Sequence, residues 1–104
     1  MDITALENML ENGRDSALLR MGLASALQQR GEPQAALVHL QSAVKQDPNL
    51  SAAWKGLGKL HLELGDREAA RLAWQQGVSV AESRGDKQAM KEMQVFLKRL
   101  DRNP

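Results

Sequence analysis

The feature that most constrains this chain is an internal repeat with a period of 34 residues. Residues 17–50 align with residues 51–84 without a gap, and both segments place the same short motifs at the same positions. The matching residues are Gly22-Leu23 and Gly56-Leu57, Gly31-Glu32 and Gly65-Asp66, Ala35-Ala36 and Ala69-Ala70, Gln41 and Gln75, and Val44 and Val78. Such a period is typical of architectures in which similar supersecondary units stack. The sequence therefore predicts two units of one kind.

Each unit is expected to be a helical hairpin that turns at its glycine and acid. Glycine accepts the left-handed conformation that ends one helix, and the acid can cap the start of the next. Pro48 is expected to end the first hairpin, because the residue before a proline is pushed out of helical geometry. The expected helices run over 16–29 and 33–46 in the first unit, and over 51–64 and 67–82 in the second.

Two further amphipathic segments flank the repeats. The first, 3–12, stops at Gly13, and the last, 86–101, begins at the capping residue Asp86. Their apolar positions, at helical spacing, are Ile3, Leu6, Met9 and Leu10, and Ala89, Met90, Met93, Phe96, Leu97 and Leu100. The composition favours helix, and no strand is expected. The expected fold class is all-α, with about six helices paired as antiparallel hairpins.

A known signature stands out in the second unit, which carries Trp54, Leu57, Gly58, His61, Ala70 and Trp74. These residues follow the pattern Trp-x2-Leu-Gly-x2-Tyr, then Ala-x3-Phe, with His61 in place of tyrosine and Trp74 in place of phenylalanine. The first unit is a weaker copy, in which Arg20 replaces the first tryptophan. Its signature positions hold Leu23, Ala24, Leu27, Ala36, Leu40, Ala43 and Pro48. The chain thus resembles the tetratricopeptide repeat (TPR) family.

The resemblance implies an antiparallel helical-hairpin TPR solenoid forming a single domain over residues 1–104. In it, 3–12 is a leading helix, 17–50 and 51–84 are the repeats, and 86–101 is a capping helix that covers the last apolar face. Gly77 and Glu82 stand where the family has alanine and proline.

The resemblance also implies a protein-interaction module, an adaptor or scaffold that binds a peptide or a partner helix in a concave groove. The first helix of each unit lines this groove, and helical spacing assigns to it Met21, Ser25, Gln28 and Gln29 from the first unit and Lys55, Lys59, Leu62 and Glu63 from the second. Lys55 and Lys59 are expected side by side, either as a site for an acidic partner or as an ordinary solvated pair.

A specialised TPR subgroup clamps the C-terminal carboxylate of chaperones with lysines and asparagines. Here the asparagine positions hold Met21, Ser25 and Gly56, so the resemblance does not extend to that clamp. The sequence leaves open whether Met93 and Phe96 belong to the core or to the groove. It also leaves open a second function, a structural unit that forms a homo-oligomer through its end helices, with the candidate contacts Ile3, Met9, Met93, Phe96 and Leu100.

Charge and composition narrow the function classes. Fourteen basic and 13 acidic residues leave a net charge of +1, so no nucleic-acid partner is expected. The chain has no cysteine, and its two histidines lack zinc-ligand spacing. His61 is expected to pack at the aromatic position of the signature, and His39 to lie half-buried or solvated. We therefore expect no catalytic residues, no cofactor and no metal, and we expect that the chain is not an enzyme.

The first residues, Met1-Asp2-Ile3-Thr4, form neither a basic leader nor a long apolar run. No later stretch is long enough to cross a bilayer. The sequence therefore predicts no membrane association and a cytoplasmic location.

Overall fold

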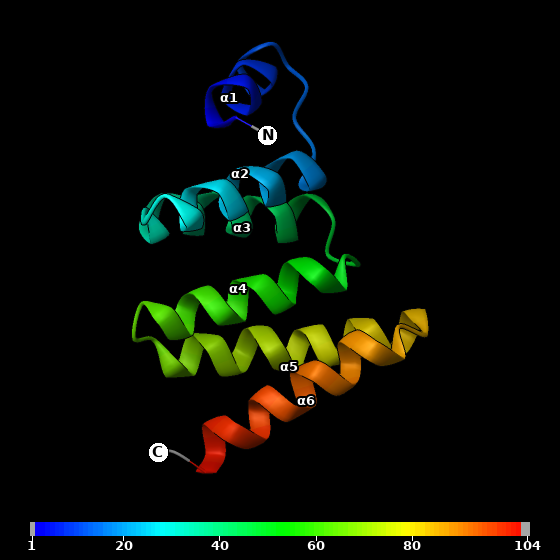
Figure 1. Ribbon diagram of the computed structural model, residues 1–104. Helices are drawn as coiled ribbons and strands as arrows, with labels where there is room; N and C mark the ends of the chain where they lie inside the picture. The colour runs from blue at the N-terminus through cyan, green and yellow to red at the C-terminus, as the bar shows by residue number, and fades with distance from the viewer. Residues whose placement is uncertain (1, 103–104) are drawn as a thin grey trace. The chain divides into compact units, whose positions relative to one another are not determined.

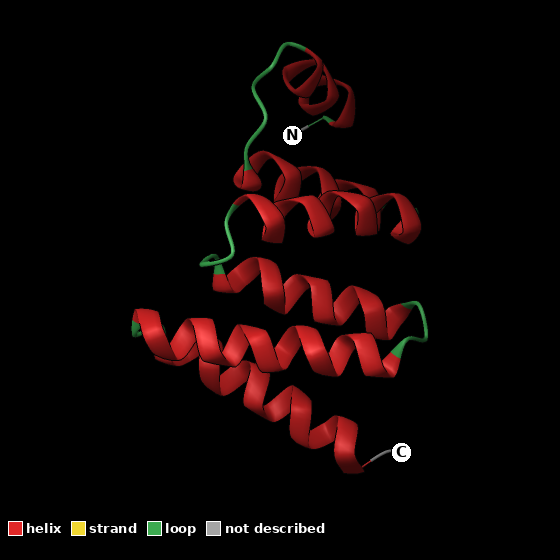
Figure 2. Ribbon diagram, turned by 180° about the vertical axis from the view of Figure 1, so that it is seen from behind, coloured by secondary structure: helices red, strands yellow, loops and turns green. Residues whose placement is uncertain are grey.

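A computed structural model describes residues 2–102, which form six helices joined by short turns (Figures 1 and 2). The helices are α1 (Ile3–Glu11), α2 (Ala17–Gln29), α3 (Pro33–Gln46), α4 (Ser51–Glu63), α5 (Arg67–Arg84) and α6 (Lys87–Arg102). No strand occurs within these residues. The all-α class and the six helices predicted from the sequence are confirmed. Met1, Asn103 and Pro104, at the ends of the predicted domain, lie outside the described residues.

The chain forms two compact units that divide after Asp47. In the first unit α2 packs against α1 and α3, and in the second α5 packs against α4 and α6. Each unit is described by itself below, and the grouping of both into one domain stays a prediction.

The turn inside each hairpin has its predicted left-handed glycine, whereas the predicted capping hydrogen bond of the acid forms in only one of the two. Gly31 and Gly65 have φ values of 79° and 85°, in the left-handed region that favours glycine. Asp66 caps α5, since its carboxylate accepts a hydrogen bond from the Ala69 N–H at 3.0 Å. Glu32 occupies the N-cap position of α3 as predicted, but its carboxylate pairs with the Arg30 guanidinium and makes no capping hydrogen bond.

Helix α5 is longer than the repeat pattern predicts. The pattern indicates an end at residue 82, whereas the helix continues to Arg84, after which Gly85 adopts a φ of 73°. The reason is that repeat 2 has Glu82 where repeat 1 has the helix-ending Pro48. The next residue, Asp86, caps α6 through the Ala89 N–H at 3.2 Å. That bond, with one from the Ser51 hydroxyl, lowers the pKa of the Asp86 carboxyl.

The core of the second unit is built around Trp74, which stands at the phenylalanine position of the signature and is 2% exposed. Its indole N–H donates to the Lys55 carbonyl at 3.2 Å, so the ring is buried without losing a hydrogen bond. Gly58 lies directly against this ring: a Cβ there would be 2.6 Å from Trp74 Cε2. Gly77 is equally tight, with its Cβ position 2.9 Å from Trp54 Cβ and against the sulfur of Met93. Both glycines are therefore required by close packing.

The first unit has a smaller aliphatic core that includes Leu23, Leu27, Ala36, Leu40 and Ala43. On its surface a polar cluster joins the loop before α2 to both helices of the hairpin.

In this cluster Arg20 donates two hydrogen bonds to Asp15, at 2.8 and 2.9 Å, and its third nitrogen lies 3.2 Å from His39 Nδ1. The guanidinium lowers the pKa of Asp15 to about 2. Partial burial, with the charge of Arg20, lowers the pKa of His39, which is half-buried as expected.

Candidate functional site

The eight predicted groove residues fall four in each unit. Met21, Ser25, Gln28 and Gln29 lie on α2, and Lys55, Lys59, Leu62 and Glu63 lie on α4. The surroundings of the two sets are therefore described separately.

In the first unit only part of the predicted set shares a surface feature. Ser25 and Gln29 are exposed and help to line a hollow of about 490 Å³ between α1 and α2. Met21 and Gln28 are half-buried and lie outside its lining. The remainder of the lining is mainly apolar and consists of Leu6, Met9, Ser16, Leu18, Leu19, Gly22 and Ala26.

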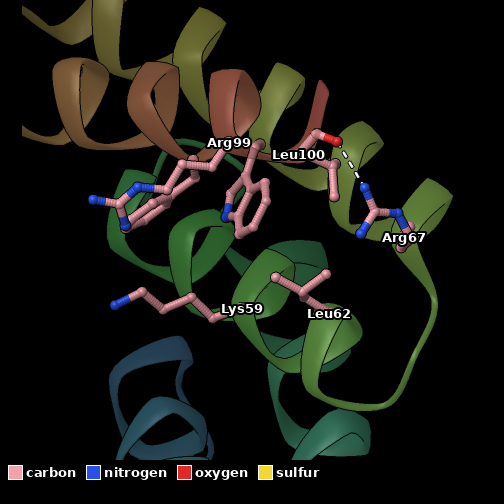
Figure 3. A pocket seen from close by; sticks show the side chains of 7 residues that line it. Lys59, Leu62, Arg67, Arg99 and Leu100 are labelled. Carbon is pink, nitrogen blue, oxygen red and sulfur yellow. Dashed lines mark hydrogen bonds between the residues drawn. The ribbon is translucent and has the colours of Figure 1, made fainter. Parts of the chain in front are cut away.

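The second unit has a hollow of about 300 Å³ where α4, α5 and α6 meet, which we call the Trp74 hollow (Figure 3). Its lining residues are Lys59 and Leu62 from α4, Arg67 and Trp74 from α5, and Phe96, Arg99 and Leu100 from α6. Of the predicted residues on α4 it includes Lys59 and Leu62, whereas Lys55 and Glu63 are not part of the lining.

Lys55 and Lys59 have different surroundings, although they lie one turn apart on α4. The Lys55 ammonium lies 3.3 and 3.4 Å from the two carboxylate oxygens of Glu92 on α6. The Lys59 ammonium lies 5.1 Å from the centroid of the Phe96 ring, within range of a cation–π interaction. In the described chain no carboxylate forms an ion pair with Lys59. Lys59 therefore keeps a positive charge at the edge of the hollow.

The open question about the capping helix is resolved by the packing of α6. Met93 is fully buried beneath Gly77, so it belongs to the core. Phe96 is half-buried and lines the hollow, where its ring meets that of Trp74 at a centroid distance of 5.2 Å and an interplanar angle of 44°. The two residues, three apart on one helix, have separate roles.

Besides Phe96, whose place the sequence leaves open, four residues of the hollow are absent from the predicted groove: Arg67, Trp74, Arg99 and Leu100. Arg67 begins α5 and donates a hydrogen bond to the Leu100 carbonyl on α6 at 2.6 Å, which closes one end of the hollow (Figure 3). The spacing of Phe96, Arg99 and Leu100, three and four residues apart, could have placed them on one face of α6. Nothing in the sequence shows that Arg67, about 30 residues away, joins them.

The charge of the Trp74 hollow is one-sided. Lys59, Arg67 and Arg99 contribute three cations, and no acidic side chain is among the described residues that line it. The floor is apolar, formed by the aromatic and leucine side chains. Such a surface suits a ligand that is apolar at its centre and negatively charged around it.

The signature histidine lies elsewhere in the same unit. His61 is half-buried beside Trp54 and Leu57, in a shallow hollow of about 430 Å³ between α4 and α5. Residues 2–102 contain no group of three or more His, Cys, Asp or Glu side chains placed to hold a metal ion. No helix among them is both long and apolar enough to cross a membrane.

Comparison with known proteins decides the family. Residues 27–81, which include most of both repeats, match the tetratricopeptide repeat family. The chain belongs to the TPR family. A TPR repeat-containing protein of Pseudomonas aeruginosa is 52% identical over 102 residues, which cover 98% of this chain and 97% of that protein. TPR folds generally mediate protein–protein interaction, and TPR proteins are generally adaptors without enzymatic activity.

Solved structures agree with this assignment. The solution structure of a Bordetella parapertussis protein is 47% identical, covers 98% of this TPR chain and 89% of its own, and has a TM-score of 0.84. A crystal structure of a TPR domain protein from Salinibacter ruber is 23% identical, with a TM-score of 0.81 over 86% of this chain and 100% of its own. The second likeness shows the fold alone.

Proposed function

We propose that this chain is a protein-interaction module whose second unit binds an acidic segment of a partner protein at the Trp74 hollow. The observation that carries the proposal is the combination of an apolar floor with the Lys59 ammonium at its edge, which forms no ion pair within the described chain. Membership of the TPR family supports a polypeptide as the ligand.

The predicted groove is refined by this proposal. Lys59 and Leu62 keep their predicted role, and Arg67 and Arg99 join them. Lys55 is assigned to holding α6 through Glu92 instead. On α2, we retain the exposed Ser25 and Gln29 as a second contact surface for the partner.

The size of the hollow sets the expected affinity. A standard protein–protein interface buries about 800 Å² on each partner, and a hollow for one or two side chains covers much less. We therefore expect exchangeable binding with a dissociation constant of about 1 μM or weaker for this site alone.

Site-specific photo-crosslinking tests the proposal and identifies the partner in the same step. Leu62, which is 39% exposed in the hollow, is replaced by a photoreactive phenylalanine derivative, and Leu72, 59% exposed outside it, serves as the control position. The Leu62 probe should capture a protein that the Leu72 probe does not.

A charge reversal then tests the site itself. Lys59→Glu should abolish the capture at position 62, whereas Lys91→Glu, on the exposed surface of α6 outside the lining, should leave it unchanged. Lys55 is left unchanged in this test, because Lys55→Glu would place a second carboxylate against Glu92 and disturb the packing of α6. Capture that survives Lys59→Glu would show that the hollow is not the binding site.

Self-association through the end helices is the second function that the sequence leaves open. Three of its candidate contacts, Ile3, Met93 and Leu100, are buried inside their units, and the other two, Met9 and Phe96, are half-buried. These positions favour the interaction module. Sedimentation at micromolar concentrations tests the alternative, which predicts a concentration-dependent dimer that is lost in Phe96→Glu.

A further inference from the structure

We infer that the partner segment presents one large apolar side chain next to an acidic residue, so that the side chain enters the Trp74 hollow and the carboxylate meets the Lys59 ammonium. This inference rests on the proposed function and specifies the chemistry of the ligand. It follows from the volume of the hollow and from the surroundings of Lys59.

The volume of the hollow fits one large side chain. An enclosed apolar cavity of about 150 Å³ is enough to bind benzene. The Trp74 hollow, at about 300 Å³ and open to solvent, has room for a phenyl or leucyl side chain together with part of the backbone that carries it. Its walls include the Trp74 and Phe96 rings, which meet at a tilted angle and offer aromatic surface to such a side chain.

The cations lie at opposite sides of this opening. In Figure 3 the side chains of Lys59 and Arg99 extend toward one side of the hollow, and Arg67 lies toward the other, beyond Leu62 and Leu100. The positive charges therefore flank the apolar floor, which favours a ligand with negative charge close to its apolar side chain.

The comparison with Lys55 explains why an external carboxylate is expected at Lys59. One turn away on the same helix, the unit supplies Glu92 to Lys55. At Lys59 it supplies the face of the Phe96 ring, which attracts the ammonium but does not neutralise it. A carboxylate of the partner could approach Lys59 while its apolar side chain lies against the same ring.

Three short peptides with blocked ends test the inference, since blocking removes their terminal charges. The first, acetyl-Asp-Glu-Phe-Glu-Asp-amide, has acids on both sides of an aromatic side chain. The second replaces the acids by their amides, as Asn-Gln-Phe-Gln-Asn, and the third keeps the acids and replaces phenylalanine by alanine.

Nuclear magnetic resonance provides the readout together with an internal control. The Trp74 side chain helps to line the hollow, so its indole N–H reports on binding there, whereas the indole N–H of Trp54 donates to the Pro48 carbonyl at 2.8 Å outside it. The first peptide should shift the Trp74 signal and leave the Trp54 signal in place. The amide and alanine peptides should each bind about 10-fold more weakly or worse, because each lacks one of the two kinds of contact.

Two protein variants locate the charge contacts. Lys59→Gln should weaken the first peptide several-fold and have little effect on the amide peptide, because only the former pairs with the ammonium. Lys98→Gln, at an exposed position of α6 outside the lining, is the matched control and should change neither affinity. Added salt should weaken the first peptide more than the second.

The possible failures are distinguishable. If the amide peptide shifts Trp74 with the same affinity as the acidic peptide, the inferred charge pattern is wrong and the proposed binding at the hollow stands. If none of the three peptides shifts Trp74 at millimolar concentration, the inferred ligand chemistry is wrong. The proposed function then still depends on its own experiment, the loss of photo-crosslinking in Lys59→Glu.

Discussion

The two hairpins of this TPR chain align residue by residue, yet their helices are held together by different means. In the α4–α5 hairpin Trp74 of α5 is buried against Gly58 of α4. In the α2–α3 hairpin, Leu40 takes the place of Trp74, and Ala24 takes the place of Gly58. Ala24 and Leu40 are buried as well. The second repeat combines a large and a minimal residue at these two positions, and the first has two residues of intermediate size, a difference that close packing permits when the two change together.

The difference extends to the surface. Repeat 1 has Ser25, Gln28 and Pro33 at the positions of Lys59, Leu62 and Arg67. The residues that give the Trp74 hollow its floor and its charge therefore occur in one repeat only. Under the proposed function, one copy of the motif is specialised for binding by substitutions at a few positions, while the helical hairpin is unchanged.

The largest expected effect is the loss of stability when Trp74, the buried ring of the second hairpin, is removed. Trp74→Ala should lower the free energy of unfolding by about 3 to 5 kcal/mol, because it removes a fully buried ring and leaves a cavity. Leu40→Ala, the matched change in repeat 1, should cost less, since a smaller side chain is removed. Urea denaturation followed by helical circular dichroism measures both. A smaller loss for Trp74→Ala than for Leu40→Ala would show that the ring does not hold the second hairpin.

The next effect concerns Gly58 and Trp74, which pack against each other between α4 and α5. Gly58→Ala should cost about 1 to 3 kcal/mol, because the new Cβ would collide with the Trp74 ring. In a Trp74→Leu background the same change should cost much less or stabilise, since it recreates the Ala24 and Leu40 pair of repeat 1. A double-mutant cycle measures this coupling. Additive costs would show that the two positions do not share one packing volume.

A smaller effect on stability separates binding from folding. The double variant Lys59→Ser and Leu62→Gln gives α4 the residues that repeat 1 has at these positions. It should change the free energy of unfolding by about 1 kcal/mol or less, since both positions are exposed. Binding of the acidic phenylalanine peptide should fall at least about 10-fold. Retained binding with unchanged stability would show that these two positions do not provide the specialisation.

The smallest effect is confined to acid pH and tests the polar cluster of repeat 1. The folded protein lowers the pKa of Asp15 from 3.8 to about 2, so this carboxylate stabilises the fold above pH 3.8 and its contribution is lost as the pH falls toward 2. Asp15→Asn should therefore be less stable than the natural chain near pH 5, with the difference shrinking between pH 4 and pH 2. Thermal unfolding across this range measures it, and a difference independent of pH would contradict the assignment.

Much of the fold is predictable because its determinants are local. The glycines at 31 and 65 mark the turns, and the repeat alignment alone is enough to predict that Trp74 is buried. The errors occur where a side chain can bond to either of two partners and the sequence does not show which one it takes. The sequence pattern predicts that Glu32 caps α3, but its longer side chain pairs with Arg30 instead.

The candidate site is predictable only in part for a related reason. Helical spacing predicts which residues of α4 share a face, and two of the four that it assigns to the groove, Lys59 and Leu62, line one hollow. It does not show which long side chains from other helices reach that face. Arg99 and Glu92 both lie on α6, yet one lines the hollow and the other pairs with Lys55. Such choices depend on the packing of three helices together.

Trp74 is both a core residue and part of the floor of the hollow, and this double position constrains how such a chain can change over time. A substitution of Trp74 that changed the shape of the hollow would also destabilise the α4–α5 hairpin. Lys59 and Arg99 are exposed and tolerate replacement far more easily. Under the proposed function, new specificities should therefore evolve through the charges at the edge of the hollow, with its aromatic floor inherited unchanged.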